Sequence, residues 1–269
     1  MIPVLTIAGS DSSGGAGIQA DLKTFAALGT YGMSCICALT AQNTKGVSMV
    51  VNTPAPMVQA QLQAIYDDIP PQAVKTGMLS SPAIVKEVSH FLKERGTAPL
   101  VVDPVMVATS GDVLLEKEAI EIYKKELIPL STLITPNIPE AEVLAGMKIE
   151  NREDMKEAAK RLMNLGPAAV LMKGGHLVEE ALDVLYDGED FQMFRGERVD
   201  TENTHGTGCT LSSAIAAGLA KGMTLEEAVR EGKRYMEGAI KRASYDSAGH
   251  GHGPVHHFWF YGEHWGKIQ

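Results

Sequence analysis

The chain alternates between short apolar runs and longer stretches in which apolar residues recur every three or four positions. Runs such as 4–8 and 168–172 are apolar at nearly every position, which is typical of strands buried on both faces. In the longer stretches, residues such as Ile18, Leu22 and Phe25 fall on one helical face. This alternation predicts an α/β protein with a mostly parallel central sheet.

The predicted elements follow one another without a linker, a repeat or a low-complexity tract. We expect strands over 4–8, 33–41, 73–79, 100–103, 132–135 and 168–172. We expect helices over 18–26, 56–65, 82–92, 116–127, 139–145 and 151–165, from about 207 onward, and over 224–243. The runs 181–186 and 191–194 flank an Asp187-Gly188 turn and predict a hairpin. We therefore expect residues 1–269 to form a single domain, a three-layer α/β/α sandwich.

Composition narrows the possible partners. The 269 residues are 45% hydrophobic and 21% charged, which is ordinary for a globular protein with a core. The formal net charge of -9 argues against nucleic acid or an anionic membrane as the main partner. The sequence has only three cysteines and no apolar stretch of signal or membrane-spanning length. We expect a cytoplasmic protein without a disulfide framework.

Polar and glycine-rich segments follow the predicted strands one after another. They are 9–17, 42–43, 76–78, 103–104, 135–137 and 173–175. Because the carboxyl ends of parallel strands meet at one edge of a sheet, these segments should converge there. Open α/β sheets bind their ligands outside this edge. The sequence therefore predicts a binding site built from these segments.

The stretch THGTGCT at 204–210 combines two glycines and a cysteine with the start of a small-residue helix. The first amides of a helix have no intrahelical partner, and the helix dipole places partial positive charge there. We therefore expect Gly206, Thr207 and Gly208 to form an anion site. We also expect the thiol of Cys209 beside them to ionise more easily than usual.

Three roles are open for Cys209 at this point. It can be an inert buried residue, which is the usual fate of a free cysteine. It can be a nucleophile that acts with the nearby His205 in a hydrolase or acyltransferase. It can also be a general base that takes a proton from a substrate hydroxyl while the preceding amides hold negative charge. The two glycines and the helix start favour a functional role over the inert one.

A second group of polar residues points to phosphate chemistry. Asn137 and Glu140 stand three positions apart at the start of a predicted helix, where they share a face. They can be ordinary helix caps, or they can belong to a magnesium–phosphate site, because Mg²⁺ prefers hard oxygen ligands. Asp103, at another strand end, can contribute to that site. Lys173 closes an apolar strand and can neutralise phosphate charge.

Other motifs were weighed and set aside. The segment GAGIQA at 15–20 fits the dinucleotide-binding pattern, but the second predicted strand ends at Gln42 rather than at the acidic residue that binds a ribose. The sequence contains no P-loop motif. His250, His252, His256 and His257 suggest metal ligands. The glycines between them and the aromatic residues after them are equally typical of a segment that docks on the surface, which is the interpretation we favour.

Taken together, the motifs resemble those of the bacterial hydroxymethylpyrimidine/phosphomethylpyrimidine kinases of thiamine biosynthesis, which belong to the ribokinase-like superfamily. The segments that carry the resemblance are TIAGSD at 6–11, SGGAGIQAD at 13–21, AQNT at 41–44, DPVM at 103–106, TPN at 135–137, MKGGH at 172–176, THGTGCT at 204–210 and GPVHHF at 253–258. They follow one another along nearly the whole chain. One departure is Ser12, where relatives often carry proline.

The resemblance implies ATP-dependent phosphorylation of 4-amino-5-hydroxymethyl-2-methylpyrimidine and then of its monophosphate, with Mg²⁺. It implies a pyrimidine pocket lined by Gly9, Asp21, Gln42 and Met78. It implies an anion hole of Gly206, Thr207 and Gly208, with Cys209 as the base. It implies that Asn137, Lys173 and Thr207 contact ATP, that Glu140 and Asp103 serve the metal, and that a mobile flap runs through Ser110-Gly111-Asp112.

Two alternatives stay open after the resemblance. Close relatives phosphorylate pyridoxine, pyridoxal or pyridoxamine, and both ring types offer a hydroxymethyl group on a six-membered nitrogen heterocycle. We prefer the pyrimidine because Gln42 and Met78 resemble that subgroup. A ligand-binding protein without turnover is the other alternative. As a family expectation, the protein forms a homodimer or a higher homo-oligomer.

Overall fold

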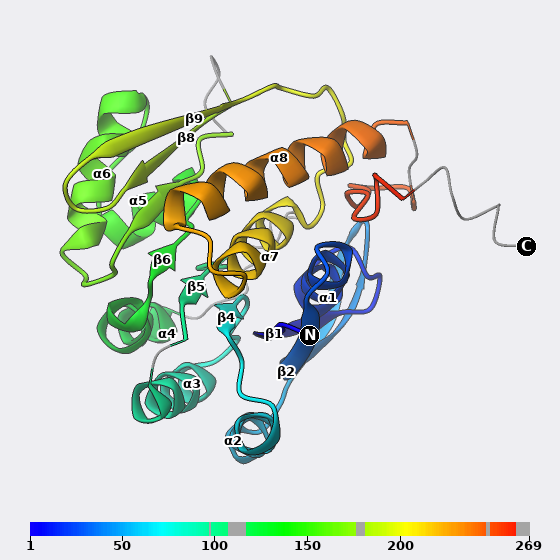
Figure 1. The fold of residues 1–269 in the computed structure, drawn as a ribbon, viewed down its shortest axis with the longest axis vertical. Helices are drawn as coiled ribbons and strands as arrows, with labels where there is room; N and C mark the ends of the chain where they lie inside the picture. The colour runs from blue at the N-terminus through cyan, green and yellow to red at the C-terminus, as the bar shows by residue number, and fades with distance from the viewer. Residues whose placement is uncertain (97, 107–116, 176–180, 246–247, 262–269) are drawn as a thin grey trace, which may run out of the picture.

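The computed structural model describes residues 1–96, 98–106, 117–175, 181–245 and 248–261, which build one nine-stranded sheet with helices on both faces (Figure 1). The strands lie in the order β3-β2-β1-β4-β5-β6-β7-β8-β9. Neighbours from β2 to β7 run parallel to one another, whereas β3, β8 and β9 join as antiparallel strands. The predicted α/β class and mostly parallel sheet are confirmed.

The elements have the following bounds. The strands are β1 (Pro3–Asp11), β2 (Tyr31–Asn43), β3 (Gly46–Asn52), β4 (Ala73–Thr76), β5 (Leu100–Val102), β6 (Leu133–Ile134), β7 (Val170–Met172), β8 (Ala181–Tyr186) and β9 (Phe191–Gly196). The helices are α1 (Gly17–Ala27), α2 (Ala55–Asp68), α3 (Pro82–Arg95), α4 (Lys117–Ile122), α5 (Ile138–Ala145), α6 (Arg152–Met163), α7 (Thr207–Ala220) and α8 (Leu225–Ala243). None of the described helices is both long and apolar enough to cross a membrane.

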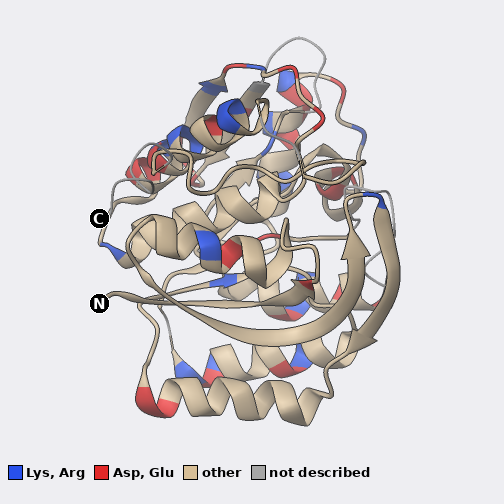
Figure 2. Ribbon diagram, turned by 90° about the vertical axis from the view of Figure 1, so that its right-hand side faces the viewer, with Lys and Arg blue, Asp and Glu red and all other residues tan. Residues whose placement is uncertain are grey.

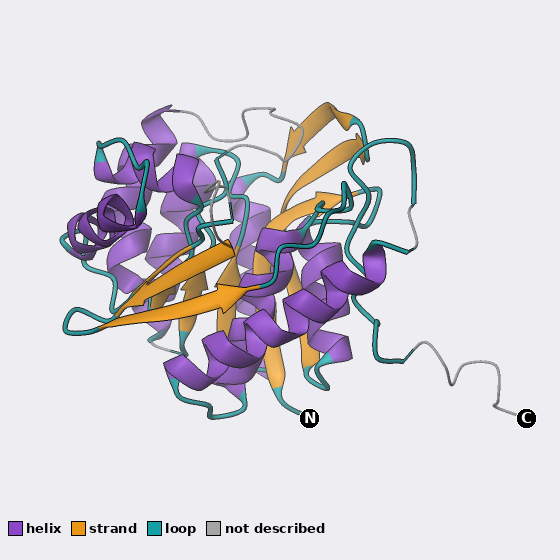
Figure 3. Ribbon diagram, turned by 90° about the horizontal axis from the view of Figure 1, so that it is seen from above, coloured by secondary structure: helices purple, strands orange, loops and turns teal. Residues whose placement is uncertain are grey.

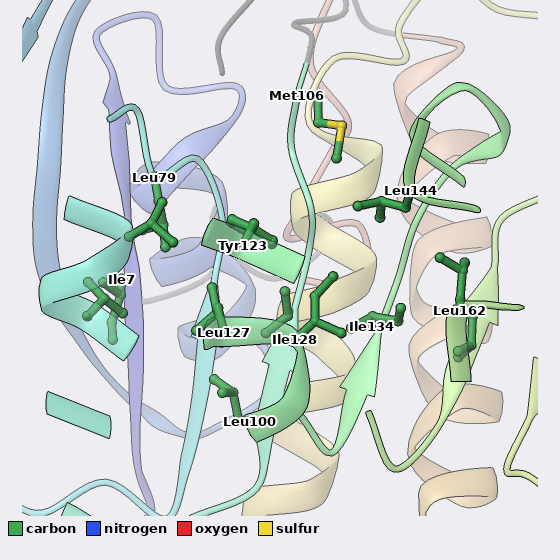
Figure 4. Close-up of a cluster of buried hydrophobic side chains, with 14 of the residues drawn as sticks. Ile7, Leu79, Leu100, Met106, Tyr123, Leu127, Ile128, Ile134, Leu144 and Leu162 are labelled. Carbon is green, nitrogen blue, oxygen red and sulfur yellow. The ribbon is translucent and has the colours of Figure 1, made fainter. Parts of the chain in front are cut away.

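Helices cover the sheet on both faces, which gives the three layers seen in Figure 3. On one face, the buried side chains of α2, α3, α4, α5 and α6 pack with those of the strands. Figure 4 shows part of this cluster, in which Ile7, Leu79, Tyr123 and Ile134 lie among other apolar side chains. On the other face, α1, α7 and α8 bury a second cluster. The core thus lies between layers, as apolar strands require.

The antiparallel hairpin of β2 and β3 was not predicted. The expected strand over 33–41 extends to Tyr31–Asn43 and turns back into β3, so that Leu39 pairs with Val51. Both of these side chains are exposed, 56% each. The strand β3 is apolar but exposed. An apolar run normally indicates a buried strand, so its sequence pattern did not predict this position. Figure 2 shows the hairpin with almost no acidic or basic residues along its strands.

Two further boundaries differ from expectation. The strand expected over 73–79 ends at Thr76, because Gly77 begins the turn that leads into the site. The helix expected over 116–127 is α4 followed by a π-turn at Tyr123–Leu127 and a 3₁₀ turn at Ile128–Leu130. Pro129 lies inside that last turn and prevents a regular continuation. The predicted hairpin at Asp187-Gly188 is confirmed as β8 and β9.

Candidate active site

A cavity of about 1080 Å³ opens along the carboxyl ends of the parallel strands. Its wall comes from the carboxyl ends of β1 and β2, from the segments that follow β1, β4, β5, β7 and β9, and from the first turns of α5 and α7 and one face of α8. Of the residues predicted from the sequence, those that line it are Gly9, Gln42, Met78, Asp103, Asn137, Glu140, Lys173, Gly206, Thr207, Gly208 and Cys209. The predicted convergence on one sheet edge is confirmed. Asp21 is the exception.

The first turn of α7 presents unsatisfied backbone amides to the cavity. Its N-cap is Gly206, which has a φ of 82° and provides no side-chain cap. A Cβ at Gly206 would overlap the carbonyl oxygen of Gly15, so both the backbone angle and the space require glycine. The amides of Gly208 and Cys209 lie at positions where a helix offers no internal acceptor. This turn can therefore hold an anion with backbone groups alone.

The thiol of Cys209 does not ionise more easily than usual, so this expectation is wrong. Burial raises the pKa of Cys209 to about 11, and the positive charge of Lys75 only partly offsets that effect. The carboxylates of Asp21 and Asp103 raise the pKa further. The helix start favours a thiolate, but desolvation and two nearby negative charges outweigh it. In the ligand-free site the thiol is therefore protonated at neutral pH.

Lys173 and Asp103 form an ion pair across the anion site. The Nζ of Lys173 lies 2.9 Å from Oδ1 of Asp103, which also accepts a hydrogen bond from Thr135 at 3.2 Å. Burial disfavours both charges, but each partner's charge outweighs it, so the pKa of Asp103 is lowered and that of Lys173 is raised. A Cβ at Gly208 would lie 3.3 Å from Nζ of Lys173. The ammonium thus faces the open turn of α7.

Asn137 and Glu140 form a capping box at the start of α5. The amide of Glu140 donates to Oδ1 of Asn137 at 2.9 Å, and the amide of Asn137 donates to Oε2 of Glu140 at 2.8 Å. The capping role considered from the sequence is therefore real. Both residues also line the cavity, so capping does not exclude a second role. Burial and then Asp103, against the opposing effect of Lys173, raise the pKa of Glu140 to about 7.

The residues present fit a magnesium ion held partly through water. Asp103 and Glu140 offer carboxylate oxygens on one cavity wall, and such hard oxygens suit Mg²⁺. Among the described residues, no group of three or more His, Cys, Asp or Glu side chains is arranged to hold a metal. Mg²⁺ usually keeps several waters and takes few protein ligands, and a phosphate would complete its coordination. The donor set is therefore that of a metal shared with a substrate.

The opposite end of the cavity contains Gly9, Gln42 and Met78. A Cβ at Gly9 would overlap Cε of Met78 unless that flexible side chain moved, so the glycine allows this close approach. The Oε1 of Gln42 accepts a hydrogen bond from the Thr40 hydroxyl at 3.1 Å. Ser12 fixes the backbone of Gln42 on both sides, donating to its carbonyl at 2.8 Å and accepting from its amide at 2.9 Å. The serine that departs from the family pattern thus anchors the pocket.

Asp21 does not line the cavity. Its carboxylate is fully buried and forms an ion pair with the equally buried Lys75, whose Nζ lies 3.0 Å from both carboxylate oxygens. The expected direct contact between Asp21 and a substrate is not what this geometry offers, because the cavity reaches Lys75 and not the aspartate behind it. Asp21 can influence the cavity only through Lys75, whose ammonium it holds in place.

Several residues that line the cavity were not predicted from the sequence as members of the site, and two of them carry buried charges. Lys75 is one, and a lysine within the apolar strand AVKT is the signal that identifies it. Asp11 is the other. It accepts hydrogen bonds from the amides of Ser13 and Ala16, each at 2.8 Å, and from His205 at 2.8 Å. Burial opposes its ionisation, but these bonds, led by that of His205, lower the pKa of Asp11 to about 2.

The partner of His205 bears on the hydrolase alternative. Its Nε2 is bonded to Asp11 and not to Cys209. A cysteine nucleophile requires a base that is hydrogen-bonded to the thiol, and the described geometry gives that nitrogen to a carboxylate. The arrangement therefore favours the general-base role of Cys209 over the nucleophilic one.

The histidine-rich segment docks on the body of the protein, as favoured from the sequence. The amide of His256 donates to the carbonyl of Ala239 in α8, and Tyr235 donates its hydroxyl to the carbonyl of His257 at 2.6 Å. The Nε2 of His257 lies 3.1 Å from the hydroxyl of Thr210 in α7. No metal-ligand group occurs among these residues as far as the structure describes them. The predicted flap through 110–112 lies outside the described residues.

Comparison with known proteins adds the family. The family model described as phosphomethylpyrimidine kinase matches residues 11–256. A hydroxymethylpyrimidine/phosphomethylpyrimidine kinase from Streptomyces coelicolor is 50% identical over 261 residues, which is 97% of this chain and 96% of that protein. The thiamine biosynthesis bifunctional protein of Geobacter sulfurreducens is 52% identical over 255 residues, which is 94% of this chain and 52% of that protein. The chain thus spans about half of the bifunctional relative.

Solved structures agree with this assignment. A crystal structure of phosphomethylpyrimidine kinase from Clostridium difficile 630 has a TM-score of 0.82 and 54% identity, covering 89% of this chain and 100% of that one. The pyridoxal kinase from Staphylococcus aureus in complex with AMP-PCP and pyridoxal has a TM-score of 0.87 at 37% identity, covering 97% of this chain and 94% of that one. The shared architecture is the ribokinase-like fold expected from the motifs. Fold, site and sequence together show that the chain belongs to the phosphomethylpyrimidine kinase family.

Proposed function

We propose that this protein transfers the γ-phosphoryl group of ATP to 4-amino-5-hydroxymethyl-2-methylpyrimidine and then to the resulting monophosphate, giving the diphosphate used in thiamine biosynthesis. The observation that carries the proposal is the open first turn of α7, which faces the Lys173–Asp103 pair in the cavity that also contains Gly9, Gln42 and Met78. Phosphoryl transfer needs a cationic cradle of this kind beside a hydroxyl-binding pocket.

The reaction follows from these positions. Cys209 accepts the proton of the substrate hydroxyl, the hydroxyl oxygen forms a bond to the γ-phosphorus, and the bond from that phosphorus to the bridging oxygen breaks to release ADP. The amides of Gly208 and Cys209 hold the transferring oxygens, and Lys173 neutralises their charge. Because the thiol is protonated in the ligand-free site, it must first release its own proton to water in the open cavity before it can accept the proton of the substrate hydroxyl.

Three proposed roles concern the nucleotide and its metal. Asn137 and Thr207 would orient the ATP phosphates from the starts of α5 and α7. Glu140 and Asp103 would hold Mg²⁺ through their carboxylates and through water, and the ion would supply charge neutralisation of the phosphates. Because Lys173 lies beside Asp103, its ammonium would neutralise phosphate charge close to a metal held by that carboxylate.

A vitamin B6 kinase is the second candidate. The similarity of the fold to a pyridoxal kinase with bound pyridoxal supports it. The names of relatives about half identical over nearly the full chain, and the pocket residues Gln42 and Met78, favour the pyrimidine as the better substrate.

The test is a product analysis with purified protein, Mg-ATP and the hydroxymethylpyrimidine. We expect the monophosphate to appear first and the diphosphate after it, with kcat/KM larger than for pyridoxal or pyridoxine measured side by side. A larger kcat/KM for the B6 vitamers would reverse the order of the two candidates. Absence of ADP release with either class would leave the ligand-binding alternative.

We also propose that the protein assembles as a homodimer or a higher homo-oligomer, and a cytoplasmic location stays a prediction. The support for assembly is the exposed apolar surface of the β2–β3 hairpin, where Leu39, Met49 and Val51 are each at least 56% exposed. Apolar surface of this kind is typical of an interface. Light scattering should give a multiple of the 28.8 kDa chain mass, and a monomer mass would contradict the proposal.

A further inference from the structure

A buried ammonium lies in the wall of the cavity, and the reaction as described does not use it. Lys75 is in the short strand β4 and is completely inaccessible to solvent, yet its side chain borders the cavity. The Nζ donates to both carboxylate oxygens of Asp21 at 3.0 Å. A buried ion pair is a poor source of stability, because its desolvation cost often exceeds its Coulombic gain. A function therefore explains its presence better than stability does.

The pair is fixed with respect to the helix that carries Cys209. One oxygen of Asp21 accepts a hydrogen bond from Thr6 at 2.6 Å, and the other accepts one from Ser213 at 2.7 Å. Ser213 lies one turn after Cys209 on α7, so the two residues share a helix face. The carboxylate is thereby tied to β1, β4 and α7, so the pair is held in place relative to the helix that carries Cys209, and Lys75 and Cys209 line the same cavity.

Cys209 is surrounded by charges from four elements. Lys75 in β4 favours negative charge on the sulfur, whereas Asp21 in α1 and Asp103 after β5 oppose it. Lys173, after β7, also interacts with the thiol. After burial, Lys75 has the largest effect, and it is larger than that of Asp21. Lys173 is assigned to the phosphates and Asp103 to the metal, which leaves the Lys75–Asp21 pair as the charges that act on the thiol alone.

We propose that Lys75 is a positioning residue for phosphoryl transfer, whose ammonium, held in place by Asp21, supports the thiolate of Cys209 that accepts the proton of the substrate hydroxyl. This inference rests on the proposed function, because it assumes that Cys209 is the base. The role of Asp21 is then to orient Lys75 and to moderate its field. A fixed internal charge costs no reorganisation when the proton moves, which is the advantage of a preorganised site.

The ion pair of Lys75 and Asp21 can be tested by whether substitutions of its two members raise or lower the reactivity of Cys209. Lys75→Met and Asp21→Asn break the same ion pair, so a purely structural role predicts that both changes act in the same direction. A field effect predicts opposite directions, because one change removes a positive charge near the sulfur and the other removes a negative charge. The double variant removes both charges, keeps the net charge of the pair and leaves no unpaired ion in the interior, so it is the folded reference if a single variant unfolds.

The experiment measures the rate of Cys209 alkylation by iodoacetamide against pH in the full chain without substrate, with the modified residue located by mass spectrometry. Cys35 and Cys37 are fully buried and serve as internal controls. We expect Asp21→Asn to react fastest, followed by the wild type, the double variant and Lys75→Met. The difference between Lys75→Met and the wild type should be roughly tenfold, the change in thiolate population for one pH unit.

The kinase assay separates the two proposals. In the same variants, the pH profile of kcat should move with the alkylation profile, toward higher pH in Lys75→Met and toward lower pH in Asp21→Asn. Equal rates in all variants, or slowing in both single variants while circular dichroism shows them folded, would overturn the role of Lys75. If the wild type shows no kinase activity, the proposed function fails, whereas the alkylation order still tests the field at the thiol.

Discussion

The first turns of α5 and α7 lie in the same cavity wall but treat their free amides in opposite ways. At α5, Asn137 and Glu140 cap each other's backbone amides. At α7, Gly206 provides no side chain, and the amides that follow it are left for a ligand. A helix start needs four acceptors, and a protein can supply them from its own side chains or leave them to a bound anion.

The difference teaches where the transferring group binds. A closed helix start gives local stability and fixes two side chains in the wall, which is what a metal-binding or phosphate-orienting residue requires. An open start gives up that stability and gains an anion site. Around Gly206, the lost cap is replaced by contacts from outside the helix, because Asp11, His205 and His257 hold the surrounding loops. Substitutions at Cys209, Gly206, His257 and Asn137 test this division.

Replacing Cys209 with alanine removes the group that we assign to proton transfer at the open turn. We expect kcat to fall by roughly 10²–10⁴, the usual contribution of general-base catalysis, with little change in the unfolding free energy. Steady-state kinetics and chemical denaturation measure the two quantities. Cys35→Ala, in the buried strand β2, is the matched control and should keep kcat. A kcat for Cys209→Ala equal to that of the wild type would reject the base assignment.

Gly206→Ala closes the open turn from inside. The added Cβ meets the carbonyl oxygen of Gly15 in a backbone conformation with a φ of 82°, so we expect a loss of roughly 3 kcal/mol in unfolding free energy together with weaker ATP binding. Gly222→Ala is a close control, because Gly222 has the same φ of 82° but no atom within 4 Å of its Cβ position. It should cost only about 1 kcal/mol. Similar losses of unfolding free energy in both variants would show that contact with the Gly15 carbonyl is not the cause.

His257 supports the first turn of α7 from outside, and this support depends on pH. Burial lowers the pKa of His257 to about 3, from 6.5 in the unfolded chain. Because the unfolded state then binds the extra proton, this contribution to stability is present above pH 6.5 and is lost as the pH falls toward 3. Between pH 7 and pH 5 the wild type should lose about 2 kcal/mol more than His257→Gln does.

Denaturant titrations at the two pH values measure this difference between His257→Gln and the wild type. His250→Gln, which changes an exposed histidine of the same segment, should follow the wild type at both values. Parallel pH dependence of the wild type and His257→Gln would show that the ring is not buried as a neutral group.

Asn137→Ala opens the closed turn of α5 and should give the smallest change in stability, about 1 kcal/mol. Because Asn137 also borders the cavity, we expect a higher KM for ATP in addition. Thr224→Ala breaks the equivalent capping box at the start of α8. Neither Thr224 nor Glu227 lines the cavity, so this variant should lose similar stability without any change in KM. An unchanged KM for Asn137→Ala would reduce Asn137 to a structural cap.

Much of the fold could be read from the sequence, because burial leaves a clear mark on parallel strands. Runs such as 170–172 are buried at every position, and the helix predicted over 224–243 is α8, with a capping box of Thr224 and Glu227 at its start. The β2–β3 hairpin was missed because its outer face is apolar and exposed. Such a strand breaks the link between an apolar sequence and burial, and the prediction of strands from a single sequence depends on that link.

The site was predictable where a residue follows a strand and less so where its environment depends on distant residues. Asn137 and Lys173 follow strands, and the parallel sheet brings them to the cavity. Asp21 was expected to face the substrate, but its partner Lys75 lies 54 residues away in the sequence and turns the carboxylate inward. A lowered pKa of Cys209 was predicted from the helix start alone. Burial and the charges around the thiol instead raise that pKa.

The bond between Asp11 and His205 joins residues that are 194 positions apart, and the segment at 253–255 then pairs with His205. Contacts of such long range carry the largest loop-closure cost and form late in folding. The second core cluster joins α1 to α7 over a comparable separation, so that layer and the anion site both form only after the two ends of the chain meet. During refolding, native secondary structure should return before catalytic activity. The recovery of turnover then measures the late step in which residues 203–210 and 253–257 join the N-terminal segment.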